Sequence, residues 1–198
     1  MQSPSWWKND TGVSWWRWCR RRQSPLIGPA PWRRYGRLGA VICWENYMPL
    51  PSMAMSAKNI QLHCTPTADD RATRLPTVQH VALEGRCFVL SCNQFTRRRD
   101  FPADFPLVQG DDPGTVIRRG GSCIVDPLGQ ALAQSDFEGE TILTAEIDLG
   151  EIVRSKYDFD VVGHDTQPDV FRLYVNEPPP PPVVAAAGVP EDLFAEKG

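Results

Sequence analysis

Short apolar runs separated by helix-like segments dominate the central part of the chain. Residues 38–43 (LGAVIC), 60–65 (IQLHCT) and 87–92 (CFVLSC) are each of strand length, and the first is continuously apolar, as expected of a strand buried on both faces. A helix is predicted to begin near Pro51, because proline is tolerated in the first helical turn. A second helix is predicted over residues 75–86, where apolar side chains recur at helical spacing. This β-α-β-α-β alternation predicts an α/β layer architecture.

The following region favours short strands joined by turns. Residues 93–119 are charged and contain proline, which is typical of an excursion over the surface. Two strands, 122–125 and 130–134, are predicted around the turn sequence DPLG, whose proline and glycine suit a type I turn. A further strand is predicted over residues 140–147.

The C-terminal part contains a short helix and then a tail. Asp148 is placed to cap a helix that runs through Lys156. Five consecutive prolines, 178–182, lie in a Pro- and Ala-rich tail that spans residues 177–198. This tail is expected to adopt polyproline-like conformations and is too sparse in apolar residues to pack alone.

Composition narrows the class of protein. Of the 198 residues, 41% are apolar and 23% charged, which is an ordinary globular balance. No run of about 18 apolar residues occurs, so the sequence predicts no transmembrane helix. Because the N-terminus lacks an apolar signal region, we expect no secretory signal. Six cysteines without an export signal favour reduced thiols in a cytoplasmic protein.

The first 35 residues differ from the rest and are predicted to be a basic arm outside the folded domain. Residues 1–37 carry a net charge of +7 and the remaining residues −10, and six of the seven tryptophans precede residue 33. Four prolines and almost no aliphatic residues leave this segment without helical or strand periodicity. We favour translation from an altered reading frame over a divergent family-like start. A selected arm that binds nucleic acid or an anionic membrane is the least favoured explanation.

Cys43 is the first candidate for chemistry. It ends an apolar predicted strand and precedes a predicted helix, a position that exposes a thiol beside backbone N–H groups able to stabilise a thiolate. A small buried core cysteine is the alternative, and local sequence alone favours it.

The segment GRLGAVICWENYMPL around Cys43 closely resembles the nucleophile segment of nitrilases, in the nitrilase/cyanide hydratase branch of the carbon–nitrogen hydrolases. The resemblance spans residues 36–176 and rests on several collinear segments rather than one motif. These segments are TPTADDR (65–71), HVALEGRCFVL (80–90), NQF and RRRD (93–95 and 97–100), GGSCIVDPLG (120–129) and KYDFDVVGH (156–164).

The resemblance implies the C-terminal part of an αββα sandwich and hydrolysis of a small-molecule nitrile. Cys43 would attack the nitrile carbon to give a thioimidate, which water converts to a carboxylic acid and ammonia. The family implies no cofactor and no metal, and it implies a homo-oligomer that binds neither membrane nor nucleic acid.

The catalytic set implied by the family is incomplete in this sequence. A general-base glutamate, a lysine and a second glutamate precede the nucleophile in the family. Here the first glutamate is Glu45, and Lys8 is the only lysine before Cys43. We therefore assign Cys43 alone as catalytic, with the Trp44 N–H and Glu45 at the oxyanion-binding position; both residues could instead only hold the turn. An impaired hydrolase and a non-catalytic subunit that only assembles with partners both remain open.

Other candidates carry weaker signals. Four further cysteines lie in or beside apolar runs without metal-binding spacing, so we expect core thiols at Cys64, Cys87, Cys92 and Cys123. His80, one helical turn from Glu84, could face the site, although a packing role is favoured. Gly120 and Gly121 precede a strand rather than a helix, so they form no phosphate loop. The triplet of arginines at 97–99 is most simply a solvated stretch.

Overall fold

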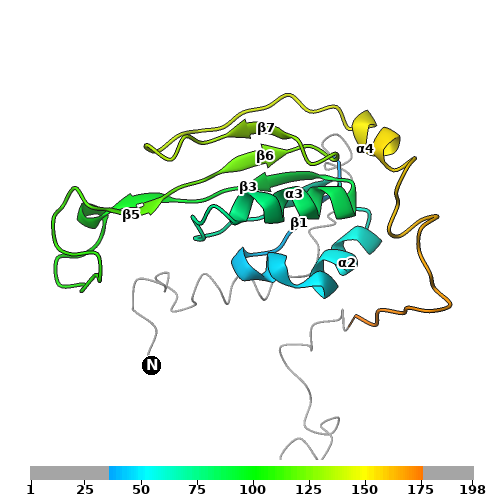
Figure 1. The fold of residues 1–198 in the computed structure, drawn as a ribbon, viewed down its shortest axis with the longest axis horizontal. Helices are drawn as coiled ribbons and strands as arrows, with labels where there is room; N and C mark the ends of the chain where they lie inside the picture. Colours follow the sequence, from blue (N-terminus) through cyan, green and yellow to red (C-terminus); the bar gives the residue numbers. More distant parts are fainter. Residues whose placement is uncertain (1–35, 176–198) are drawn as a thin grey trace, which may run out of the picture.

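The computed structural model describes residues 36–175, which form a mixed α/β fold around one five-stranded sheet (Figure 1). The strand order is β1-β2-β3-β6-β7; the first three strands run parallel, and β6 and β7 are antiparallel to their neighbours. The elements are β1 (Leu38–Ala40), the 3₁₀ helix η3 (Cys43–Tyr47), α2 (Pro49–Ala57), β2 (Leu62–Cys64), α3 (Arg74–Gly85), β3 (Phe88–Ser91), β4 (Phe95–Arg97), the 3₁₀ helix η4 (Arg98–Asp100), β5 (Val116–Arg119), β6 (Cys123–Val125), β7 (Ala131–Gln134) and α4 (Gly150–Ser155).

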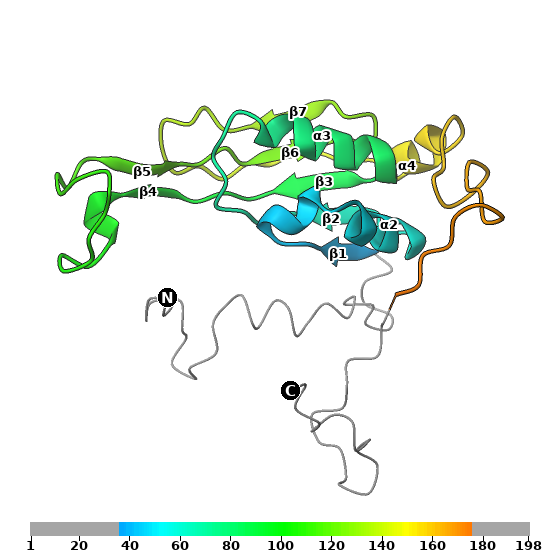
Figure 2. The same ribbon diagram turned by 60° about the horizontal axis from the view of Figure 1, so that its bottom comes forward.

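Helices α2 and α3 lie on the same side of the sheet (Figure 2), and the core lies beneath α3. Residues on successive positions of a strand point to opposite faces, and burial follows that alternation. Val89, Cys123 and Val125 on the helix side are buried against Val78, Val81 and Ala82 of α3. Leu90 and Ile124, their neighbours on the opposite face, are only half-buried. The face beneath the helices is therefore well covered by the described residues. The opposite face is covered at Phe88, which is 1% exposed, and only partly at Leu90 and Ile124.

Most predicted elements are confirmed, with shorter strands than the apolar runs suggested. The helix predicted from Pro51 begins at Pro49, because both prolines fit the first turn. The turn between β6 and β7 has the expected chemistry: Gly129 has φ +80° and its N–H donates to the Asp126 carbonyl at 3.0 Å. The Asp126 carboxylate accepts from Leu128 N and Gln130 N, which fixes the turn. The N-cap of α4 is Leu149 rather than the predicted Asp148, although the Asp148 carboxylate one residue earlier accepts the Gly150 N–H at 2.8 Å.

The strand predicted over residues 140–147 is wrong. This segment has no regular secondary structure, and Ile142 is 92% exposed. An apolar alternation becomes a strand only when another strand lies beside it to accept and donate backbone hydrogen bonds. No such neighbour occurs within residues 36–175.

Residues 93–119 form the expected excursion, but part of it is ordered as a two-stranded ribbon. β4 and β5 pair antiparallel and extend away from the five-stranded sheet (Figure 1). The arginine triplet is not simply solvated: Arg98 is 5% exposed and donates to the carbonyl oxygens of Phe101, Pro102 and Ala103. A guanidinium with five donors can organise a loop that has no ladder of its own.

The predicted arm (residues 1–35), including Lys8, and the whole predicted tail (177–198) lie outside the described residues. No helix in the part that the structure describes is long and apolar enough to cross a membrane.

Candidate functional site

Cys43 occupies a sharp turn just after β1. Its φ is +50°, a left-handed conformation that L-residues other than glycine and asparagine adopt rarely, at a strain of about 1 kcal/mol. It is the first residue of η3 and is half-buried. The backbone therefore leaves the sheet abruptly at Cys43, and strain of this kind tends to persist where a side chain must be held for function.

Three contacts hold this turn in place. The side-chain amide of Asn46, itself buried, donates to the carbonyl oxygens of Val41 at 3.1 Å and Cys43 at 2.9 Å. The Glu45 carboxylate accepts the Ile42 N–H at 2.9 Å. This hydrogen bond supports the alternative role predicted for Glu45, which is to hold the turn.

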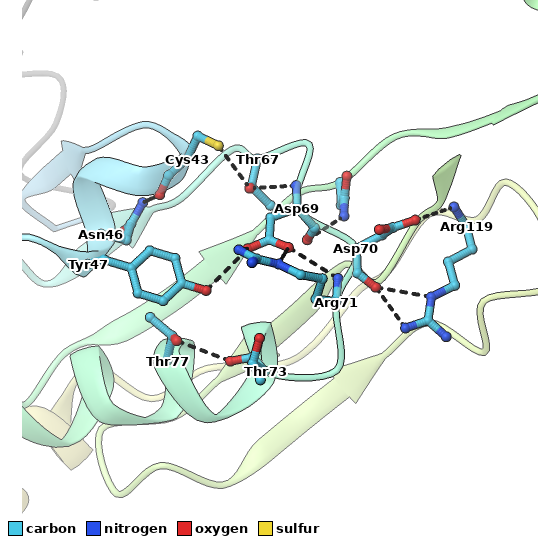
Figure 3. A network of polar contacts seen from close by, with 11 residues as sticks. Cys43, Asn46, Tyr47, Thr67, Asp69, Asp70, Arg71, Thr73, Thr77 and Arg119 are labelled. Carbon is cyan, nitrogen blue, oxygen red and sulfur yellow. Dashed lines mark hydrogen bonds and ion pairs between the residues drawn. The ribbon is translucent and has the colours of Figure 1, made fainter. Parts of the chain in front are cut away.

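The hydroxyl of Thr67 is the group that the structure brings to the thiol. Thr67 Oγ1 lies 3.5 Å from Cys43 Sγ and accepts the Asp69 N–H at 3.0 Å (Figure 3). Thr67 belongs to the loop that follows β2, 24 residues beyond the cysteine. Sequence inspection missed it as a site residue, although it lies inside the family-like segment 65–71.

An ion pair organises the rest of this loop. Arg71 donates to both carboxylate oxygens of Asp69 at 2.7 Å, and the Tyr47 hydroxyl donates to the same carboxylate at 3.2 Å (Figure 3). The hydrogen bonds from Arg71 lower the pKa of Asp69 to about 2. The Arg71 guanidinium also lies 5.9 Å from the ring centroid of Trp44. The Asp69–Arg71 pair therefore joins the loop to two residues of η3, because Asp69 accepts from Tyr47 and Arg71 lies over the ring of Trp44.

The neighbouring Asp70 links this loop to the ribbon. Arg119, the last residue of β5, donates to the Asp70 carbonyl through Nε and Nη2, at 3.0 and 2.8 Å. Its backbone N–H donates to the Asp70 carboxylate at 3.1 Å (Figure 3). The Arg119 guanidinium also lies 4.8 Å from the Phe137 ring centroid.

A buried cation lies beneath the loop. Arg74 is 3% exposed and donates from Nη2 to the Thr65 carbonyl at 3.3 Å, while its Nε and Nη1 have no hydrogen-bond partner within residues 36–175. Burial lowers the pKa of Arg74. Arg74, Asp69 and Arg71 line a cavity of about 150 Å³ together with Cys123 and Phe137.

The other thiols differ from Cys43 in environment. Burial raises the pKa of Cys87 to about 12, and it also raises the pKa values of Cys64 and Cys123. The prediction of a core thiol is confirmed for Cys87 and Cys123 but is wrong for Cys92, which is exposed just after β3. β3 ends at Ser91, so Cys92 lies outside the strand and its side chain does not pack in the core.

The side chains of the remaining predicted residues do not gather around the thiol. Trp44 is 67% exposed, and His80 is exposed on α3. Glu84 lines a small cavity of about 10 Å³ between the helices and the sheet, together with the buried His63. Desolvation and the nearby Arg74 charge lower the pKa of His63 to about 4.

No lysine of the described region serves the cysteine. Lys58 follows α2, and its carbonyl accepts from Arg37, which precedes β1, whereas Cys43 follows β1. Lys156 pairs with Asp160 beyond α4. Within residues 36–175 there is also no group of three or more His, Cys, Asp or Glu side chains arranged to hold a metal ion.

Comparison with known proteins shows extensive similarity to one family. A family model described as carbon–nitrogen hydrolase matches residues 15–157. Nitrilase blr3397 of Bradyrhizobium diazoefficiens is 58% identical over 142 residues, which cover 72% of this chain and 44% of that protein. The bifunctional nitrilase/nitrile hydratase NIT4A of Lupinus angustifolius is 50% identical, covering 72% of this chain and 42% of that protein. The crystal structure of the C. elegans NitFhit protein superposes with a TM-score of 0.57 at 27% identity, covering 72% of this chain and 32% of that one.

The chain thus spans less than half the length of these curated relatives. The family match begins at residue 15, inside the segment predicted as an arm, and residues 15–35 lie outside the described structure. The domain boundary at residue 36 stays a prediction.

Proposed function

Because this chain belongs to the carbon–nitrogen hydrolase family, we propose that Cys43 is the nucleophile of a nitrilase-type hydrolase acting on a small organic nitrile. The observation that supports this most directly is the position of Cys43: a half-buried thiol on a strained turn, contacted by a hydroxyl, within the segment that resembles the family nucleophile. The enzyme needs no cofactor for this chemistry.

In the proposed reaction the Cys43 thiolate forms a C–S bond to the nitrile carbon, and one C≡N electron pair moves to nitrogen, which takes up a proton. Water adds to the resulting thioimidate, and the C–N bond breaks to release ammonia and leave a thioester. A second water releases the carboxylic acid and restores the thiolate. The Trp44 N–H, in the first turn of η3, is the proposed donor to negative charge that develops on the substrate nitrogen.

We further propose that this chain is catalytically impaired. Both water-addition steps need a base, and the sequence has no glutamate before Cys43. Glu45 is the nearest carboxylate in sequence, but its Oε2 accepts the Ile42 N–H. Loss of a general base typically lowers a rate by about 10²–10⁴-fold. We therefore expect Cys43 to form the thioimidate faster than water hydrolyses it.

The test is ammonia and carboxylic acid release from aliphatic, aryl and arylacetonitriles, with amide measured in parallel and Cys43→Ala as the control. We expect trace turnover that Cys43→Ala abolishes, together with a covalent adduct on Cys43 visible by mass spectrometry. Sustained turnover would overturn the impairment and indicate another base. Absence of any adduct at Cys43 would overturn its role as nucleophile.

The second candidate function is that of a non-catalytic subunit that assembles with partners. The half-buried side chains of Leu90 and Ile124 on the second face of the sheet favour it. Co-expression with a tagged, full-length nitrilase relative distinguishes the two: co-purification without adduct formation at Cys43 supports the subunit. A homo-oligomer in the cytoplasm, without membrane or nucleic acid partners, remains part of the proposal.

A further inference from the structure

The Thr67 hydroxyl lies between a backbone donor and the candidate nucleophile. Its oxygen accepts the Asp69 N–H at 3.0 Å and lies 3.5 Å from Cys43 Sγ, within hydrogen-bond distance for sulfur (Figure 3). A threonine hydroxyl has one proton and two lone pairs. With one lone pair taken by Asp69, the proton is free to point at the sulfur.

Hydrogen bonds to the segment that follows β3 fix the position of the loop that carries this hydroxyl. The Thr67 N–H donates to the Cys92 carbonyl at 2.9 Å, and Thr67 forms an isolated parallel bridge with Asn93. The buried amide of Asn93 in turn donates to the carbonyls of Asp69 at 2.9 Å and Gly120 at 2.6 Å. Thr67, which carries the hydroxyl, and Asp69, which donates to it, are thus both hydrogen-bonded to the segment that follows β3.

The chemistry of sulfur decides the direction of the hydrogen bond. A thiol can donate or accept, but a thiolate can only accept, so the hydroxyl must donate once Cys43 loses its proton. A hydrogen bond to the charged partner is stronger than one to the neutral partner and favours the charged form.

We propose that Thr67 is a catalytic residue that donates a hydrogen bond to the Cys43 thiolate. It stabilises the thiolate before attack and again when sulfur leaves the thioester, and its proton stays on Oγ1 throughout. Its role in nitrile hydrolysis rests on the proposed function. Its effect on the thiolate does not, because any electrophile that reacts with sulfur reports on it.

The test measures the rate of Cys43 alkylation by iodoacetamide as a function of pH, with peptide mapping, in the full chain. Thr67→Val removes the hydroxyl with little change in shape, and Thr67→Ser keeps it. Thr77→Val is the matched control, because the Thr77 hydroxyl donates to the carbonyl of Thr73, the N-cap residue of α3, and not to the cysteine.

Thr67→Val should lower the rate at about pH 7 by about tenfold and move the whole pH profile upward, with the rates converging at high pH. Thr67→Ser and Thr77→Val should keep the wild-type profile. An unchanged profile in Thr67→Val would overturn the proposal. A loss that is equal at every pH would also overturn it, because that indicates changed access. Should the valine variant unfold, Thr67→Ala replaces it, and the same contrast with serine decides the outcome. A chain whose Cys43 alkylates as described but forms no covalent adduct with any nitrile would refute the proposed function and leave the role of Thr67 intact.

Discussion

The Cys43 N–H donates to the Pro66 carbonyl oxygen at 2.8 Å. This hydrogen bond anchors the turn to the loop that follows β2. It also occupies the amide of the cysteine itself, which in other cysteine and serine hydrolases can help to bind an oxyanion. The next amide, that of Trp44, is the donor that we propose for the negative charge that develops on the substrate.

Cys43 should be the most reactive of the described thiols. Cys64, Cys87 and Cys123 are held in their neutral form by burial, which raises their pKa values. Limited iodoacetamide labelling followed by peptide mapping measures the order, with Cys43→Ser as the control. Cys92, which is exposed, is the strongest competitor; its preferential labelling, or that of Cys64, would contradict the assignment.

Asn46→Ala should lower the free energy of unfolding by about 1–3 kcal/mol, because it leaves the carbonyls of Val41 and Cys43 without the buried amide donor. Urea unfolding measures the change. Gln94→Ala, which removes an exposed amide, should have an effect below about 0.5 kcal/mol. Equal effects from the two substitutions would show that Asn46 does not hold the turn.

Acid should destabilise the fold through His63 before the carboxylates titrate. The unfolded chain binds a proton at His63 with a pKa near 6.5, whereas the folded chain binds it only near pH 4. Stability is therefore lost as the pH falls from 6.5 towards 4, by about 3 kcal/mol at most. Urea midpoints across this range measure it. His63→Gln should flatten the dependence, and the exposed His80→Gln should leave it unchanged.

Asp69→Asn should destabilise the loop at neutral pH and not at low pH. The folded-state pKa of Asp69 is lowered to about 2, so its contribution is present above its unfolded value near 3.8 and disappears as the pH falls towards 2. Because Arg71 is largely exposed, screening limits the effect to about 1 kcal/mol. Urea unfolding of the wild type and Asp69→Asn at neutral pH and at pH 2 tests this, with the exposed Asp104→Asn as control. A difference in stability between wild type and Asp69→Asn that persists at pH 2 would argue against the ion pair.

The purified chain should self-associate. Its sheet has a half-buried second face, and the unpaired segment 140–147 exposes Ile142. Ile142→Lys should reduce association in size-exclusion chromatography, whereas Val108→Lys, at an equally exposed position in the excursion, should not. A monodisperse wild-type monomer with a cooperative thermal transition would contradict this expectation.

Sequence patterns predicted the elements whose formation depends mainly on residues close together in the chain. The helix around Val78 and the turn at Gly129 each depend on residues close together in the chain, and both are confirmed. The strand at β1 is also confirmed, because β2 pairs with it. The segment around Ile142 failed because strand formation depends on a neighbouring strand that sequence spacing does not reveal. Cys43 stood out by its position, but Thr67 did not, because chain folding across 24 residues brings its hydroxyl to the sulfur.

The three hydrogen bonds from Arg119 to Asp70 tie the β4–β5 ribbon to the loop that follows β2. Asp70 lies between Asp69 and Arg71, whose ion pair supports the residues beside Cys43. The ribbon extends away from the five-stranded sheet, and Arg119 connects its second strand to Asp70 (Figure 1). Through Arg119 and Asp70, the ribbon and the loop that carries Thr67 therefore form one hydrogen-bonded unit.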